Sequence, residues 1–205
     1  MNPPRTLHLR HGPLSRQTAH LSLDMQNLFA EETAWKTPWM ARVLPMVTSI
    51  ATHRPERTIF TRFIPPRYPE EAPGVWRRYY ERWHQFTQAE ADPHLFQLVP
   101  ELAKFVPPAK VVDKSVYSPF HGQALLRILQ TWEIDTLIVT GAETDVCVGA
   151  SVFAAMDYGF RVILVRDAVC GSADETHDAL MKVYADRFSQ QVELVDAAVV
   201  LRHWQ

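Results

Sequence analysis

The stretch "IDTLIVTGAETDVCVGASVFAAMDYGFRVILVRD", residues 134–167, decides how this chain folds. It starts with an apolar, β-branched run, crosses a short turn into an alanine-rich segment, and ends in a second apolar run. Short apolar runs bounded by turns are typical of buried strands, and the segment between them has the length of a helix. Because two strands joined by a helix run in parallel, the stretch predicts a strand–helix–strand unit.

The same alternation continues along the chain from Thr18. We expect strands at residues 19–24, 57–63, 109–114, 135–140, 160–167 and 191–195, with helices at about 36–53, 75–90, 121–132, 145–158 and 174–187. This order predicts an α/β fold, a doubly wound and mainly parallel sheet with helices on both faces. A length of 205 residues suits a single domain over residues 1–205, in which we expect residues 1–17 to form a flexible N-terminal segment.

Composition limits the classes of partner. The chain is 47% hydrophobic and 21% charged with a formal charge of −2, so it has no basic excess that would attract nucleic acid. No apolar run reaches the roughly 20 residues that span a bilayer, and the N-terminus lacks the apolar part of a secretion signal. The two cysteines, Cys147 and Cys170, have no C-x-x-C spacing, and we expect both to be reduced. These features predict a cytoplasmic protein that binds neither nucleic acid nor a membrane.

Reactive side chains stand at the ends of three expected strands. Asp24 closes the first strand, Lys114 closes the third, and Cys147 follows the fourth across a short turn. Each alone is compatible with a solvated strand end, but sheets of this class bind ligands outside the carboxyl ends of their strands. The first strand continues as "DMQNLFA" without the G-x-G-x-x-G of a dinucleotide site, so we expect no nicotinamide or flavin cofactor.

The position of Cys147 allows two interpretations. Thr144 or Asp145 can cap the helix that follows, which places Cys147 in its first turn, and a helix N-terminus or a nearby cation lowers the pKa of a thiol. The thiol would then be a nucleophile. A buried cysteine is also a common small apolar filler, and the residues alone leave both interpretations open.

Three motifs resemble a known family. "LDMQN" with Asp24, "VVDKSVYSPF" with Lys114 and "VTGAETDVCV" with Cys147 resemble, in order and approximate spacing, the motifs of the isochorismatase-like cysteine hydrolases. The likeness extends from about residue 18 to residue 195. It implies a three-layer sandwich with an Asp24, Lys114 and Cys147 catalytic triad. It also implies a cis peptide just before Glu143 and an oxyanion hole formed by the N–H groups of Glu143 and Cys147.

The resemblance further implies a hydrolase that needs no metal or other cofactor and acts on a small-molecule substrate. It would cleave a C–N bond of an amide, carbamoyl or ureido compound through a thioester on Cys147, and it would assemble as a homodimer or homotetramer. Two alternatives stay open: a vinyl-ether hydrolase of the isochorismatase type, which does not need the thiol, and a noncatalytic binding or redox protein. Nicotinamidases of this superfamily bind a metal through histidines after the second strand, but here no histidine lies between His53 and His84.

Residues 65–95 combine a proline-rich connection with an aromatic segment. Its rings recur at spacings of three or four, which places them along one side of a helix: Trp76, Tyr79, Tyr80, Trp83 and Phe86. The segment either packs into the core or forms an oligomer interface, or it is a lid over the substrate. As a lid, it would form a substrate site together with neighbouring residues, and we name as candidates Phe29, Arg62, Tyr80, Trp83 and Tyr117. In that site Arg62 or Arg77 would meet an acidic group of the substrate.

Two residues after the fifth strand have less defined roles. We expect Cys170 to be structural and His177 to lie at the surface, in the first turn of a helix; a supporting role of His177 beside the active site also stays open. The sequence "SADE", residues 172–175, predicts a capping box between Ser172 and Glu175 at the start of that helix.

Overall fold

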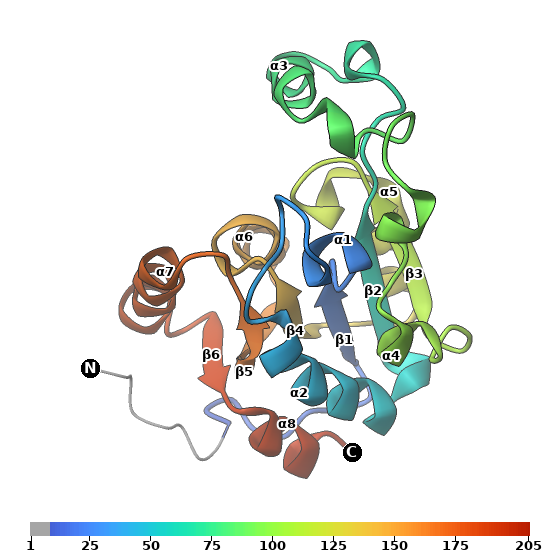
Figure 1. Cartoon of the computed structure of the whole chain (residues 1–205). Helices are drawn as coiled ribbons and strands as arrows, with labels where there is room; N and C mark the ends of the chain where they lie inside the picture. Colours follow the sequence, from blue (N-terminus) through green and yellow to red (C-terminus); the bar gives the residue numbers. More distant parts are fainter. Residues whose placement is uncertain (1–8) are drawn as a thin grey trace.

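A computed structural model describes residues 9–205 and contains one parallel sheet (Figure 1). The strands are β1 (Thr18–Leu23), β2 (Thr58–Phe63), β3 (Lys110–Lys114), β4 (Thr136–Ala142), β5 (Arg161–Cys170) and β6 (Val192–Val195). Their order across the sheet is β3-β2-β1-β4-β5-β6, and every neighbouring pair is parallel. The strand order reverses between β1 and β4, so the predicted doubly wound α/β fold is confirmed.

The helices that alternate with these strands are α1 (Asn27–Ala30), α2 (Met40–His53), α3 (Val75–Arg82), α4 (Pro100–Ala103), α5 (Gln123–Thr131), α6 (Gly149–Asp157), α7 (Asp174–Arg187) and α8 (Ala197–His203). Short turns of 3₁₀ helix lie at Pro55–Arg57, Pro69–Glu71, His84–Phe86, Pro93–Phe96 and Pro119–His121, and a π turn covers Thr144–Val148. None of the helices within residues 9–205 is long and apolar enough to cross a membrane.

The two faces of the sheet are covered by different helices. On one face, α2 and α8 pack through Val47 and Val199 in a cluster that includes Ile138 of β4. On the other face, α5, α6 and α7 cover a second cluster, to which β4 contributes Leu137 and Val139. Adjacent residues of β4 therefore belong to opposite cores, as the alternation of side chains along a strand requires.

The predicted helix at 75–90 was too long. In the structure α3 ends at Arg82, and Trp83 leaves helical geometry with φ −108° and ψ 37°. A separate 3₁₀ turn, His84–Phe86, then carries Phe86 into the core. The spacing of the rings is compatible with one helix, but the chain leaves the helix after Arg82, and Phe86 is buried from a separate turn.

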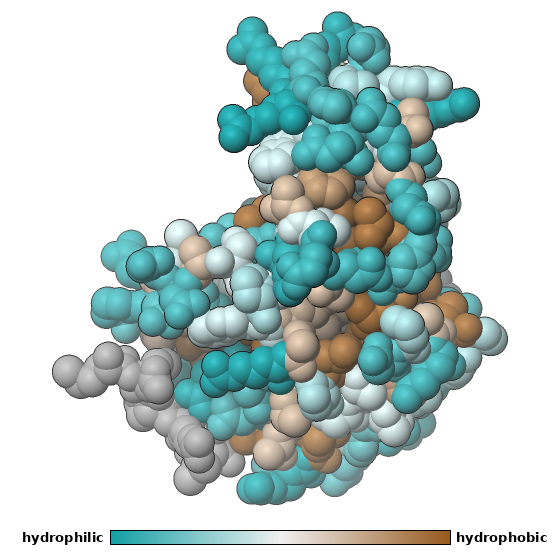
Figure 2. All heavy atoms as spheres, viewed as in Figure 1, coloured by the Kyte–Doolittle hydropathy of each residue, from teal (hydrophilic) through white to brown (hydrophobic). Residues whose placement is uncertain are grey.

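Residues 65–95, which we call the arm, project from one end of the sheet (Figure 1). Figure 2 shows apolar side chains gathered where the arm meets the body, whereas the outer end of the arm is mostly hydrophilic. Near the N-terminal end of the described residues, Leu14 is buried and forms an isolated parallel β-bridge with Trp204. Residues 1–8 of the segment expected to be flexible lie outside the described residues.

Candidate active site

Asp24 directly follows β1 and is held by the neighbouring strand. The Thr61 hydroxyl of β2 donates to Asp24 Oδ1 at 2.6 Å, and the backbone N–H of Asp24 donates to the same Thr61 oxygen at 3.1 Å. Asp24 has φ +50°, a left-handed conformation that non-glycine residues seldom adopt and that clusters at functional sites. This pair of hydrogen bonds fixes the direction of a buried carboxylate.

Lys114 joins the acid to the thiol. Its Nζ lies 2.7 Å from Asp24 Oδ2, donates to Cys147 Sγ at 3.3 Å, and donates to the Val116 carbonyl oxygen at 3.2 Å. The ammonium also lies 4.9 Å from the centre of the Phe63 ring. Burial lowers the pKa of Lys114, but the charge of Asp24 and the hydrogen bonds to Asp24 and Cys147 outweigh burial and raise it. Lys114 therefore remains a cation although only 7% of it is exposed.

Cys147 lies in the π turn before α6, at the carboxyl end of β4. Burial raises the pKa of the thiol well above its usual value, and the Asp24 carboxylate raises it further, while Lys114 lowers it. We expected the helix start and the cation to lower the pKa of the Cys147 thiol. That expectation is wrong, because the effect of burial is larger. The resting sulfur carries its proton and needs a base to remove it.

The caps expected for this helix are also absent. Neither Thr144 nor Asp145 caps it, and the Thr144 hydroxyl instead shares a hydrogen bond of 2.8 Å with Nδ1 of His177. The turn is closed by the Val148 N–H, which donates to the Glu143 carbonyl oxygen at 3.0 Å. His177 is thus buried against the turn, with Trp39 beside its ring, and the expected surface position of His177 is wrong.

The turn between β4 and Cys147 contains the cis peptide that the resemblance implied. The bond joins Ala142 to Glu143. Just before it, Gly141 has φ +106°, and a Cβ atom there would lie 2.1 Å from the carbonyl oxygen of Leu23. Only glycine lets β4 approach β1 this closely beside Asp24. The oxyanion hole formed by the N–H groups of Glu143 and Cys147 stays a prediction.

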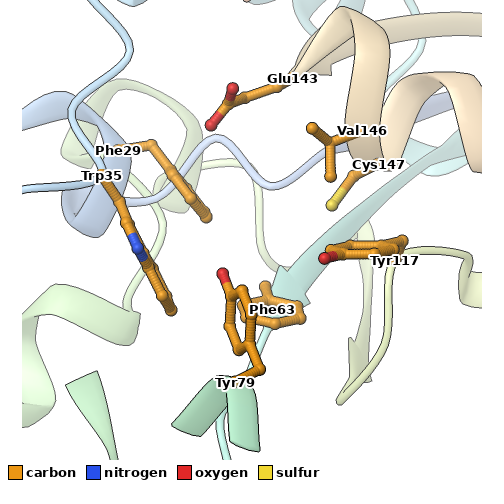
Figure 3. Close-up of a pocket in the computed structure, with 8 residues that line it drawn as sticks. All are labelled: Phe29, Trp35, Phe63, Tyr79, Tyr117, Glu143, Val146 and Cys147. Carbon is orange, nitrogen blue, oxygen red and sulfur yellow. The ribbon is translucent and has the colours of Figure 1, made fainter. Parts of the chain in front are cut away.

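A pocket opens in front of the sulfur (Figure 3). It encloses about 140 Å³ and is lined by Phe29, Trp35, Phe63, Tyr79, Tyr117, Glu143, Val146 and Cys147. Five of these residues are aromatic. The pocket therefore offers the thiol to a small molecule with flat or apolar surfaces.

The candidate substrate residues separate into two groups. Phe29 and Tyr117 line the pocket, but Arg62, Tyr80 and Trp83 do not. The Arg62 guanidinium is held by both carboxylate oxygens of Asp113, at 2.7 and 2.8 Å, and it also donates to the Gln97 side chain. Tyr80 is only 1% exposed, and Trp83 packs against Trp35.

Sequence reasoning missed several residues of the site. Three of them line the pocket, namely Trp35, Phe63 and Val146, and Tyr79, which also lines it, was named only as one ring of the aromatic segment. Thr61 and Gln26 support it, and Gln26 fixes the end of β2 by donating to the Phe63 carbonyl oxygen and accepting from the Phe63 N–H. The position of Gln26, two residues after Asp24, was the available signal. Nothing in the sequence distinguished Tyr79 from Tyr80.

The side chain of Glu143 also belongs to the pocket, although only its N–H had been considered. Ser172 donates to Glu143 Oε2 at 2.8 Å, so the predicted capping box of Ser172 with Glu175 is wrong; Ala173 is the residue before α7. Burial raises the pKa of Glu143, the Ser172 hydrogen bonds lower it, and the charges of Asp145 and Asp24 raise it.

Cys170 and the histidines lie apart from the pocket. Cys170 is fully buried, 4.0 Å from the Gly141 carbonyl oxygen. His53 Nε2 lies 2.6 Å from the Trp204 carbonyl oxygen, while His84 pairs with Glu90 and His94 with Glu31, each at 2.8 Å. Residues 9–205 contain no group of three potential ligands that could hold a metal ion.

Comparisons with known proteins identify similar sequences. The family model for the isochorismatase domain matches residues 18–196. A maleamate amidohydrolase of Pseudomonas putida is 32% identical over 93 residues, which cover 45% of this chain and 44% of that protein. The match thus spans less than half the length of that relative. A probable inactive nicotinamidase of Arabidopsis thaliana is 26% identical over 80% of this chain and 86% of its own length.

The fold also matches solved structures. A cysteine hydrolase of Pseudomonas syringae superposes with a TM-score of 0.82, covering 99% of this chain and 98% of that one at 24% identity. An identity this low supports the fold alone.

Proposed function

This chain belongs to the isochorismatase family, and on that premise we propose that it is a cysteine hydrolase of small amides or carbamoyl compounds. The observation that carries the proposal is the contact of Lys114 Nζ with both Asp24, at 2.7 Å, and Cys147 Sγ, at 3.3 Å, beside the pocket. An acid, an amine and a thiol that are remote in sequence are thereby able to exchange protons. The amidohydrolase activity named for the Pseudomonas putida relative supports the reaction class.

The first half of the proposed reaction forms a thioester. Because the thiol is protonated at rest, Asp24 accepts its proton as the sulfur attacks the carbonyl carbon. Lys114 balances the negative charges of the carboxylate and the sulfur. Charge that develops on the carbonyl oxygen meets the N–H groups of Glu143 and Cys147, and one such donor contributes about 3 kcal/mol in related sites. The C–N bond breaks as Asp24 returns the proton to the departing nitrogen.

The second half releases the acid. Asp24, ionised again, takes a proton from water, and the oxygen of that water attacks the thioester. The C–S bond breaks, the carboxylic acid leaves, and the sulfur recovers its proton. No step needs a metal ion, since Lys114 supplies the positive charge and the two N–H groups supply the oxyanion donors.

Replacement of Cys147 tests the proposal. We expect Cys147→Ala and Cys147→Ser to abolish ammonia release from a panel of primary amides, carbamoyl acids and ureas, with unchanged circular dichroism. In the wild type, mass spectrometry should detect an acyl adduct on Cys147. Cys170→Ala is the matched control, because Cys170 is also buried but lies outside the pocket, and this variant should keep its activity.

Other outcomes support the alternatives. Full turnover by Cys147→Ala would refute the thioester and favour acid catalysis by Asp24 on a vinyl ether. No turnover of any amide and no adduct on the wild type would favour a noncatalytic binding or redox protein.

A further inference from the structure

We propose that the pocket selects amides whose non-reacting end carries a positive charge, with the Glu143 carboxylate as counter-ion and the aromatic rings as cation–π partners. This inference rests on the proposed hydrolase function and names its substrate class. Three observations support the inference: the charges that face the pocket, the aromatic rings that line the pocket, and the volume of the pocket.

The charges near the pocket favour a cation over an anion. Glu143 is the only acidic residue among those that line it, and no arginine or lysine of residues 9–205 is among them. The charge of Lys114 is already engaged by Asp24 and Cys147. A substrate carboxylate would therefore meet a carboxylate and find no free cation.

The arginines that sequence reasoning offered for an acidic substrate are engaged elsewhere. Arg62 forms a bidentate ion pair with Asp113. Arg77 donates to the Glu70 carbonyl oxygen at 2.9 Å and is exposed. Bidentate pairs of the first kind are among the strongest charged hydrogen bonds in proteins, so Arg62 has little reason to turn toward the pocket.

The rings supply the second element of a cation site. Figure 3 shows Phe29 and Trp35 on one side of the space before Cys147, Phe63 and Tyr79 beneath it, and Tyr117 next to the sulfur. The face of an aromatic ring attracts a cation within about 6 Å of its centre, and tryptophan does so most strongly. Phe63 already interacts in this way with Lys114, at 4.9 Å.

The Glu143 carboxyl completes the arrangement. Figure 3 shows it across the cavity from Phe63 and Tyr79. Its Oε2 accepts a hydrogen bond from Ser172 at 2.8 Å, which orients the group without neutralising it. Burial and the charges of Asp145 and Asp24 disfavour the ionised form, and a bound ammonium would stabilise that form.

The size of the pocket limits the substrate. A cavity of about 140 Å³ resembles the cavity of roughly 150 Å³ that accommodates benzene in another protein. An amide group with a single compact ammonium group, such as trimethylammonium, matches this volume. The rings alone would also suit a neutral aromatic amide, and the test must separate these two classes.

Three primary amides of similar shape provide the test. They are trimethylammonioacetamide, which is cationic, its neutral isostere 3,3-dimethylbutanamide, and the anionic monoamide of malonic acid; benzamide represents neutral aromatic amides. We expect kcat/KM, measured by ammonia release, to be about tenfold or more higher for the cation than for its neutral isostere, and lowest for the anion. Glu143→Gln should reduce the ratio of cation to neutral isostere at least fivefold.

Glu175→Gln is the matched control, because it removes an exposed carboxylate outside the pocket and should leave the ratio unchanged. Equal rates for cation and neutral isostere, preference for the anion or for benzamide, or an unchanged ratio in Glu143→Gln would overturn the inference. Calorimetric binding of the same amides to Cys147→Ser separates the two proposals. If no amide is hydrolysed, the hydrolase function fails, and the order of binding affinities alone then decides the charge preference.

Discussion

At the scale of single residues, the candidate site contains a buried ion pair between Asp24 and Lys114 beside a buried thiol. Cys147, Asp24 and Lys114 are all buried, and removal from water opposes the charged form of each. Lys114 keeps its charge because Asp24 and Cys147 contact it, whereas the thiol keeps its proton. The proposed reaction therefore depends on how accurately Asp24 is aimed, and Thr61 holds that carboxylate.

Thr61→Val tests this positioning role. The variant keeps the shape of the side chain but removes the hydrogen bond of 2.6 Å to Asp24 Oδ1. Hydrogen bonds to charged groups contribute about 1.5–3 kcal/mol, so we expect kcat to fall about 10- to 100-fold with a smaller change in KM. Thr61→Ser should restore most of the rate. Thr52→Val, at an exposed position of α2, is the control, and an equal loss there would contradict the role of Thr61.

His20 predicts a pH dependence of stability. It lies in β1 with no exposed surface, 2.8 Å from the Thr140 hydroxyl, and burial lowers its pKa to about 3. Between about pH 6.5 and pH 3 the unfolded chain binds a proton at this residue that the folded chain does not, so stability is lost as the pH falls. At pH 5 we expect the loss due to His20 to be about 2 kcal/mol relative to neutral pH.

Urea unfolding at pH 7 and pH 5 measures this loss. His20→Gln does not titrate in this range, so its free energy of unfolding should fall by about 2 kcal/mol less than that of the wild type. Identical pH dependence in the two proteins would show that His20 contributes nothing to it.

The meeting of the three candidate catalytic side chains was predictable from sequence because they lie at or just beyond strand ends. Asp24, Lys114 and Cys147 each follow an apolar run, and the carboxyl ends of parallel strands share one edge of the sheet. The lining residues were not predictable in the same way. Tyr79 and Tyr80 are adjacent on α3, and only the docking of that helix determines which of them reaches the pocket.

At the scale of elements, the junction of β1 with β4 determines where the site can form. Leu23 pairs with Gly141, and these residues immediately precede Asp24 and the turn that carries Cys147. The strands were predicted to within a few residues, because their apolar runs are clear. The π turn was not predicted. Its i→i+5 hydrogen bond requires no sequence pattern different from that of an α-helix.

Gly141→Ala should therefore disrupt this junction. The new Cβ would lie 2.1 Å from the Leu23 carbonyl oxygen, and backbone atoms cannot yield as a flexible side chain can. We expect a loss of about 4 kcal/mol or more in the free energy of unfolding. Gly159→Ala is the matched control, because Gly159 also has positive φ, +83°, but no atom within 4 Å of the added carbon.

For the control we expect a loss of only about 1–2 kcal/mol, caused by backbone conformation alone. Thermal unfolding of the two variants measures the difference. Similar melting temperatures would mean that contact with Leu23 does not constrain β4.

At the scale of the whole molecule, a projecting arm is attached to a compact sheet through one cluster of rings. Trp35, which precedes α2, lies at the centre of this cluster, with ring-centre distances of 4.2–6.4 Å to Phe29, Phe63, Tyr79, Trp83 and Phe86. Three of these partners belong to the arm. The sequence showed that the arm was aromatic, but Trp35 lies 30 residues before its first residue, residue 65, and no periodicity connects them.

Trp35→Ala should loosen the arm selectively. Loss of a large aromatic side chain from a packed cluster costs about 3–5 kcal/mol when the residue is fully buried, and Trp35 is half-buried, so we expect about 2–3 kcal/mol. Amide hydrogen exchange should accelerate in residues 75–86 more than in β1 or β4. Trp132→Ala, which removes a half-buried tryptophan outside the cluster, is the control. Equal acceleration of the arm in both variants would exclude Trp35 as its attachment point.

The central place of β1 has a consequence for biosynthesis. A ribosome makes β1 first, but one edge of β1 lies bare until residues 136–142 have emerged, and the sulfur follows only at residue 147. Contacts this remote in sequence form late and leave hydrophobic edges open meanwhile. A nascent chain that stalls before β4 thus holds Asp24 and Lys114 but not Cys147, so the thiol emerges only after both of its charged partners have been translated.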